Sequence, residues 1–120
     1  MPFPQESRLA KVRRLRPSWI EISPEVIAHN VARLRRLIGF SSKIMFTCKG
    51  DGYGFGVVKA ARLAIEAGVD GLCIGSPEEA ILLREAGIEV PILMFACTLP
   101  QAAEDVIDLD VTVTIHSLEI

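Results

Sequence analysis

Short apolar runs alternate with segments of helical character along most of the chain, and this alternation is the feature that most limits its possible folds. The runs lie at 43–48, 71–75, 91–96 and 111–115. Apolar strands separated by helices are typical of a parallel sheet that is buried on both faces. A repeat of about 20–25 residues suits the βα units of a TIM-type barrel, and an open doubly wound sheet is the alternative fold.

The segments between the runs carry helix start and stop signals. Ser23 offers an N-cap, and apolar residues then continue at helical spacing until Gly39, which can end the helix. Ser76 and Glu79 have the spacing of a capping box. Further helices are predicted near 56–67, 77–86 and 100–107. Ser117 would cap a helix that the chain does not complete. The alternating residues 18–22 predict a short strand.

A lysine closes the first apolar run, and the densest glycine cluster of the chain follows it. Lys49 precedes glycines at 50, 52, 54 and 56, and only Asp51, Tyr53 and Phe55 project from this stretch. Apolar neighbours should remove part of the solvation of the ammonium, and a neutral amine can form a Schiff base with a carbonyl compound or with pyridoxal phosphate. An exposed lysine at a strand end is the alternative interpretation.

The glycine cluster does not match either of the common nucleotide-binding loops. Position 55 is Phe where G-x-G-x-x-G requires its third glycine, and Lys49 precedes the glycines, which excludes G-x-x-x-x-G-K-[ST]. Glycines still allow close approach of the backbone to a ligand and positive φ. The hydroxyl of Tyr53 could bind a phosphate oxygen.

Residues 46–56, which read FTCKGDGYGFG, resemble the lysine segment V-V-K-A-(D/N)-A-Y-G-H-G of the alanine racemase family. Residues 16–22, RPSWIEI, followed by His29 and Asn30, are similar to the opening of that family. Similar pieces recur at 71–75, 78–80, 83–84, 86–88 and 91–93. The resemblance extends over roughly residues 16–118, nearly the whole chain.

This resemblance implies an α/β fold, the N-terminal half of a pyridoxal-phosphate-binding (β/α)8 TIM-type barrel. It implies that Lys49 holds the cofactor covalently and serves as one of two racemisation bases, and that Tyr53 hydrogen-bonds the cofactor phosphate. No metal is implied. Two departures from the family pattern stand out: Phe55 replaces a His, and Gly50 and Gly52 replace alanines, which should loosen the loop.

The implied function is a pyridoxal-phosphate-dependent isomerase, an amino-acid racemase that interconverts L- and D-alanine. A non-catalytic pyridoxal-phosphate-binding barrel and another fold-type III enzyme are the alternatives. We expect a basic N-terminal extension at 1–16 and an incomplete barrel domain at 17–120. Because four strands do not close an eight-stranded barrel, we expect the chain to be the N-terminal part of a longer protein or a truncated product. The resemblance implies that the full-length form acts as a homodimer and that the 120-residue chain is inactive alone.

Composition favours a cytoplasmic globular protein. Hydrophobic residues make up 50% of the chain and charged residues 23%, which excludes a disordered polyelectrolyte. No apolar run approaches the roughly 18–20 residues that span a bilayer, and the N-terminus lacks the apolar core of a signal peptide. We therefore expect no membrane partner.

Neither the cysteines nor the charges predict another kind of site. Cys48, Cys73 and Cys97 lack metal-ligand spacing and are expected to be small buried side chains of successive strands. Residues 1–40 carry eight basic side chains against three acidic ones. No stacking or groove-binding motif accompanies them, which favours a solvated extension over nucleic-acid binding.

Overall fold

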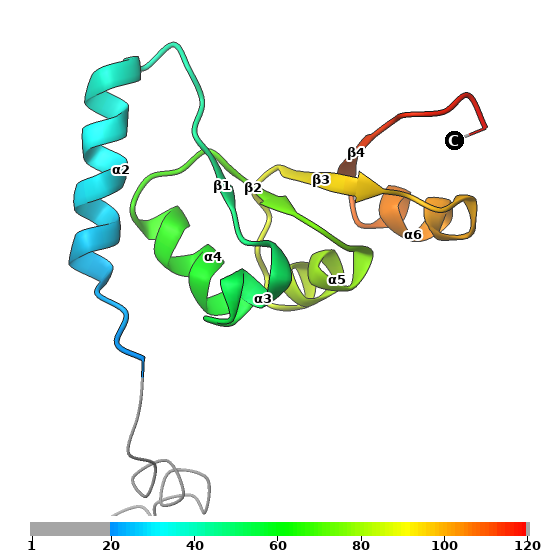
Figure 1. The fold of residues 1–120 in the computed structure, drawn as a ribbon, viewed down its shortest axis with the longest axis horizontal. Helices are drawn as coiled ribbons and strands as arrows, with labels where there is room; N and C mark the ends of the chain where they lie inside the picture. Colours follow the sequence, from blue (N-terminus) through cyan, green and yellow to red (C-terminus); the bar gives the residue numbers. More distant parts are fainter. Residues whose placement is uncertain (1–19, 120) are drawn as a thin grey trace, which may run out of the picture.

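The computed structural model describes residues 20–119, in which helices and parallel strands alternate (Figure 1). Helical segments follow β1, β2 and β3, as the apolar runs predict. The elements, in chain order, are α2 (Pro24–Ile38), β1 (Met45–Thr47), α3 (Lys49–Tyr53), α4 (Val57–Glu66), β2 (Gly71–Ile74), α5 (Pro77–Glu85), β3 (Ile92–Cys97), the 3-10 helix η1 (Pro100–Ala102), α6 (Ala103–Asp108) and β4 (Val111–Thr114).

The four strands form one parallel sheet in the order β1-β2-β3-β4, so neighbours in sequence are neighbours in the sheet. Met45 pairs with Gly71, and Leu72 pairs with Ile92. Right-handed βα connections between parallel strands place the intervening helices on one side. Figure 1 shows α4, α5 and α6 together on the same face of the sheet. This arrangement confirms the predicted α/β fold and matches the start of a TIM-type barrel.

The core lies between the sheet and these helices. Leu72, Ile74, Ile92 and Met94 point from the strands into this layer and are fully or almost fully buried, together with Leu83 of α5. Successive side chains of a strand point to opposite faces, so the neighbours of these residues lie on the other face.

The other face of the sheet is only partly covered by the described residues, which corrects the predicted burial on both faces. Phe95 of β3 is 49% exposed and Met45 of β1 is 37% exposed. Apolar runs do not show which face of a sheet is covered, because side chains that point into a barrel are as apolar as side chains that pack against a helix.

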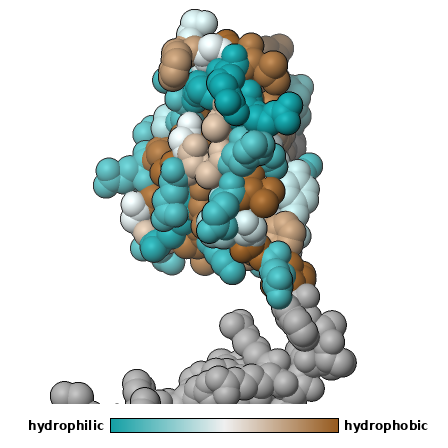
Figure 2. All heavy atoms as spheres, turned by 90° about the vertical axis from the view of Figure 1, so that its left-hand side faces the viewer, coloured by the Kyte–Doolittle hydropathy of each residue, from teal (hydrophilic) through white to brown (hydrophobic). Residues whose placement is uncertain are grey.

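Helix α2 stands at the edge of the sheet and packs against α4. Its N-cap is Ser23, whose hydroxyl accepts a hydrogen bond from Val26 N–H, and Gly39 ends it, as predicted. Val31 contacts Ala64 and Val69 in a second small apolar cluster. The opposite side of α2 faces solvent, and Figure 2 shows mainly hydrophilic side chains there with apolar patches between them.

An ion pair ties α2 to the start of β2. The Arg35 guanidinium contacts the Asp70 carboxylate and also donates to the carbonyl oxygen of Ser42 at 2.7 Å. Asp70 in turn accepts a hydrogen bond from Ile44 N–H at 2.6 Å. Arg35 and Asp70 therefore fix the segment through which the chain enters β1.

Some sequence predictions fall outside this description or differ from it. Residues 20–22 are not a strand, since no neighbouring strand pairs with them, and residues 18–19 and the predicted extension 1–16 lie outside the described residues. Residues 117–119 form a bend and turn instead of a helix. No helix of residues 20–119 is both long enough and apolar enough to cross a membrane.

Candidate active site

The two predicted site residues lie at the carboxyl end of β1, where parallel strands of α/β folds commonly present functional groups. Lys49 is the first residue of α3 and Tyr53 is the last. Both are exposed, Tyr53 by 61%. The predicted desolvation of Lys49 is therefore wrong for this chain, and the alternative of an exposed lysine at a strand end describes its surroundings.

The segment between them is a left-handed helical turn, which the sequence had indicated only as a loop. The φ angles are +63° at Gly50, +53° at Asp51, +63° at Gly52 and +56° at Tyr53. Each L-residue in this conformation costs about 1–2 kcal/mol of conformational free energy. Glycine takes it without that cost, so the two glycines suit the turn instead of merely loosening it.

Hydrogen bonds to backbone atoms close the turn. Gly52 N–H donates to the Cys48 carbonyl at 2.8 Å, and Gly56 N–H donates to the Asp51 carbonyl at 2.8 Å. The Asp51 carboxylate accepts from Val57 N–H, also at 2.8 Å, and so satisfies the first free donor of α4.

A carboxylate from α5 attaches the turn to the next strand. Glu79 Oε1 accepts a hydrogen bond from Asp51 N–H at 3.0 Å, and its Oε2 accepts from Gly75 N–H at 2.8 Å. The Ser76 side chain makes no capping hydrogen bond, and Glu79 accepts from Gly75 N–H instead of from the N–H of Ser76, so the predicted capping box does not form. Sequence reasoning found Glu79 as a helix-start residue but missed its contact with the turn, because no local pattern links positions 28 residues apart.

The residue before Lys49, Cys48, is buried and anchors the start of the turn in the core. Cys48 is fully buried, and its thiol lies 3.7 Å from the carbonyl oxygen of Cys73. Burial, followed by the charge of Glu79 and the neighbouring Cys73, raises the pKa of the Cys48 thiol to about 11. The thiol stays neutral near pH 7 and is not a nucleophile there. Buried cysteines are thus confirmed at 48 and 73, while the side chain of Cys97 lies outside the description.

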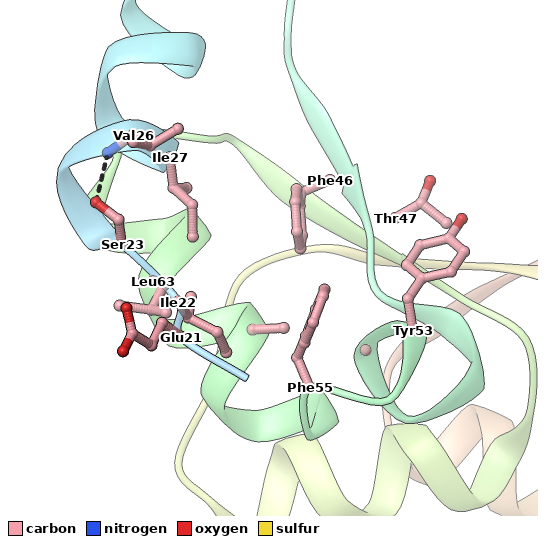
Figure 3. A pocket seen from close by; sticks show the side chains of 12 residues that line it. Glu21, Ile22, Ser23, Val26, Ile27, Phe46, Thr47, Tyr53, Phe55 and Leu63 are labelled. Atoms are coloured by element: carbon pink, nitrogen blue, oxygen red, sulfur yellow. Dashed lines mark hydrogen bonds between the residues drawn. The ribbon is translucent and has the colours of Figure 1, made fainter. Parts of the chain in front are cut away.

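An apolar pocket of about 530 Å³ opens beside the turn (Figure 3). Figure 3 shows the rings of Phe46 and Phe55 facing this space, with Tyr53 next to Thr47 at one side. Phe55, where the family pattern has His, therefore contributes a hydrophobic wall. Ile22 from the segment before α2 lines the same pocket.

The chemistry of these groups fits pyridoxal phosphate. Lys49 offers an amine for an aldehyde carbon, and Tyr53 offers a hydroxyl for a phosphate oxygen. The backbone of the turn is open, since nothing lies within 4 Å of the place where a β-carbon would stand at Gly50 or Gly54. Among residues 20–119, no group of three or more His, Cys, Asp or Glu side chains is arranged to hold a metal ion.

Comparison with known proteins gives a consistent result. A family model described as the alanine racemase N-terminal domain matches residues 22–120. An alanine racemase of Desulforamulus reducens is 38% identical over 104 residues, which cover 87% of this chain and 28% of that protein. Alanine racemase 2 of Bacillus subtilis is 41% identical over 87 residues, which cover 72% of this chain and 22% of that protein.

Solved structures agree in fold. The alanine racemase from Bacillus anthracis with bound L-Ala-P superposes with a TM-score of 0.81 at 33% identity, over 87% of this chain and 27% of that one. The alanine racemase of Clostridium difficile in complex with cycloserine gives a TM-score of 0.80 at 36% identity, over 87% of this chain and 28% of that one. The chain thus spans roughly a quarter of the length of the relatives that it matches.

Proposed function

Because the chain belongs to the alanine racemase family, through its N-terminal domain, we propose that it supplies the cofactor-binding segment of a pyridoxal-phosphate-dependent racemase of small amino acids, alanine first. One observation carries the proposal: Lys49 and Tyr53 begin and end a left-handed turn at the carboxyl end of β1. An amine and a hydroxyl are thereby presented from one short, hydrogen-bonded segment, as a ligand with an aldehyde and a phosphate requires.

Each of these residues has a defined role in the proposal. The Nζ of Lys49 would hold the cofactor, and the same amine, when free, would remove or return the α-proton on one face of the substrate. The Tyr53 hydroxyl donates a hydrogen bond to the phosphate. Bound pyridoxal phosphate supplies an electron sink that stabilises the negative charge left on the α-carbon.

Racemisation requires a second base on the opposite face of the α-carbon, and we propose that it comes from outside the described residues. Asp51 is the nearest carboxylate in the sequence, but its oxygen already accepts from Val57 N–H. Tyr53 is engaged with the phosphate. The resemblance supports a tyrosine from a further domain, contributed across a homodimer interface.

The domain division and location belong to the same proposal. We propose a barrel domain over 17–120, preceded by a basic extension at 1–16, in a cytoplasmic protein. The family model supports this division, since its match begins at residue 22 and continues to residue 120.

Borohydride reduction in the presence of pyridoxal phosphate, followed by peptide mapping, tests the assignment of the lysine. We expect visible absorbance before reduction and a phosphopyridoxyl group on Lys49 afterwards. Lys49→Arg should abolish both signals, whereas Lys59→Arg, at an exposed position of α4, is the matched control that retains them. Modification of another lysine with Lys49 unmodified would reject the proposal.

A further inference from the structure

The Glu79 carboxylate connects the ends of two neighbouring strands. One of its oxygens accepts from the turn after β1, at Asp51 N–H, and the other accepts from the residue after β2, at Gly75 N–H. A carboxylate is the only side-chain group that offers two acceptor oxygens and no donor, so its chemistry matches two converging N–H groups. Glu79 is half-buried, and its hydrogen bond with Gly75 N–H is partly buried, which strengthens that bond relative to a fully solvated contact.

The turn held in this way needs external support. Asp51 and Tyr53 are the two residues of the turn that adopt positive φ without being glycine. Their strain favours a return to ordinary backbone conformations unless surrounding contacts oppose it. The bond from Glu79 to Asp51 N–H acts directly on the first of these two residues.

The same carboxylate and the stem of Lys49 both lie close to Gly75. A β-carbon placed on Gly75 would be 3.2 Å from the Cβ of Lys49 and 3.6 Å from Oε2 of Glu79. The lysine stem and the carboxylate therefore both lie near the bare backbone of Gly75. Glu79 holds Gly75, the residue that the Lys49 stem lies beside, and it holds the middle of the turn through Asp51 N–H.

We propose that Glu79 is a positioning residue, which sets where the Lys49 amine stands relative to the Tyr53 hydroxyl by fixing the left-handed turn to the end of β2. The inference rests on the proposed function, since it assigns Glu79 to the same cofactor. It predicts that loss of Glu79 changes the position of the Lys49 amine relative to the Tyr53 hydroxyl. The reactivity of the amine itself should not change.

The decisive variant is Glu79→Gln. An amide keeps the size of the side chain but has one acceptor oxygen and an NH2 donor, so it cannot accept from Asp51 N–H and Gly75 N–H together. Glu78→Gln is the matched control, because Glu78 lies in the same helical turn, is exposed, and does not bond to these two N–H groups. Glu79→Asp retains both oxygens on a shorter stem and serves as the conservative variant.

Two measurements test the inference. Absorbance titration gives the preference of each variant for pyridoxal phosphate over pyridoxal, which lacks the phosphate. We expect this preference to fall at least about tenfold in Glu79→Gln, less in Glu79→Asp and not at all in Glu78→Gln. Amide hydrogen exchange without cofactor should accelerate at Asp51 and Gly75 in Glu79→Gln alone.

The outcomes separate this inference from the proposed function. The positioning role would be overturned, while the proposed function stands, if Glu79→Gln kept the wild-type preference for pyridoxal phosphate. It would also be overturned if Glu79→Gln lost affinity for both ligands equally and in proportion to its loss of stability. A wild-type chain that shows no preference for pyridoxal phosphate would overturn the proposed function and this inference with it. If Glu79→Gln does not fold, the preference of Glu79→Asp decides, and an unchanged value rejects the role.

Discussion

Gly52 lies against Ala60, so closely that a β-carbon at position 52 would stand 2.9 Å from the Ala60 Cβ. This contact joins the left-handed turn to α4. Gly50 has the same φ of +63°, but nothing lies within 4 Å of its missing β-carbon. The two glycines therefore share a backbone conformation and differ in steric surroundings.

We expect Gly52→Ala to be more destabilising than Gly50→Ala. Positive φ should cost each variant about 1–2 kcal/mol of unfolding free energy, and the contact with Ala60 adds to the cost at position 52 only. Chemical denaturation measures both values. Ala60→Gly should recover part of the loss in the Gly52→Ala background, and equal losses at positions 50 and 52 would contradict the steric argument.

The contact between Arg35 and Asp70 should make stability depend on pH. The hydrogen bond from Arg35, followed by that from Ile44 N–H, holds the pKa of the Asp70 carboxyl below its ordinary value. A carboxyl with a lowered folded pKa stabilises the fold above its unfolded pKa, about 4, and this contribution is lost as the pH falls through the folded value.

Asp70→Asn measures that contribution directly. We expect the variant to be less stable than the wild type by a constant amount above about pH 5, and the difference to shrink as the pH falls below about 4. Urea denaturation at a series of pH values gives the difference. Asp108→Asn, at an exposed carboxylate near the end of α6, is the matched control. A difference between Asp70→Asn and wild type that grows on acidification would contradict the assignment.

Arg84 is predicted to stabilise the packing of α5 through backbone contacts. Its guanidinium donates to the carbonyl oxygens of Leu109 at 2.9 Å, Ile88 at 2.7 Å, Val90 at 3.0 Å and Asp110 at 3.0 Å. Lysine keeps the charge but cannot reproduce this planar set of donors. We expect Arg84→Lys to lower the unfolding free energy by about 2–4 kcal/mol.

Arg62→Lys provides the comparison for that variant. Arg62 is exposed and makes one hydrogen bond, 3.0 Å long, to the carbonyl oxygen of Ala86. Its replacement should change the unfolding free energy by no more than about 0.5 kcal/mol in thermal or denaturant unfolding. Similar losses of unfolding free energy in Arg62→Lys and Arg84→Lys would show that the four hydrogen bonds of Arg84 do not stabilise the packing of α5.

The role proposed for Tyr53 predicts a selective loss of cofactor affinity when its hydroxyl is removed. Tyr53→Phe removes one hydrogen bond to a charged group, about 1.5–3 kcal/mol, so affinity for pyridoxal phosphate should fall by about ten- to a hundredfold. Affinity for pyridoxal should change less. Phe40→Leu, at an exposed aromatic residue that does not line the pocket, leaves the Tyr53 hydroxyl in place and is the control. Equal losses for both ligands in Tyr53→Phe would mean that the ring only packs.

The 120-residue chain supplied with pyridoxal phosphate should not racemise alanine beyond the rate of the free cofactor. Proton removal on one face and delivery on the other need two positioned bases, and the proposed function assigns Lys49 to one face only. Exchange of α-deuterium in L- and D-alanine, with analysis of both enantiomers, measures the rate. Fast turnover that Lys49→Ala abolishes would show that a second base is already present in the chain.

The sequence predicted the strands and the place of the lysine well, because hydropathy reports burial and the end of an apolar run marks the end of a strand. It did not predict which face of the sheet is covered, since Phe95 and Met94 are equally apolar although one is exposed and the other fully buried. The bond between Glu79 and Asp51 was also out of reach. Contacts of this kind arise only when two parallel strands bring their ends together, and local patterns do not encode them.

The left-handed turn is a short stretch of mirror-image backbone within a protein of L-residues. A D-amino acid has the same steric freedom at positive φ that an L-amino acid has at negative φ. D-alanine placed at position 50 by chemical synthesis should therefore fit where L-alanine is strained, since the space around this position is open. Backbone handedness thus explains the glycines at 50 and 52, because a residue without a stereocentre has no preference between the two mirror images, whereas Asp51 and Tyr53 adopt the same handedness under strain.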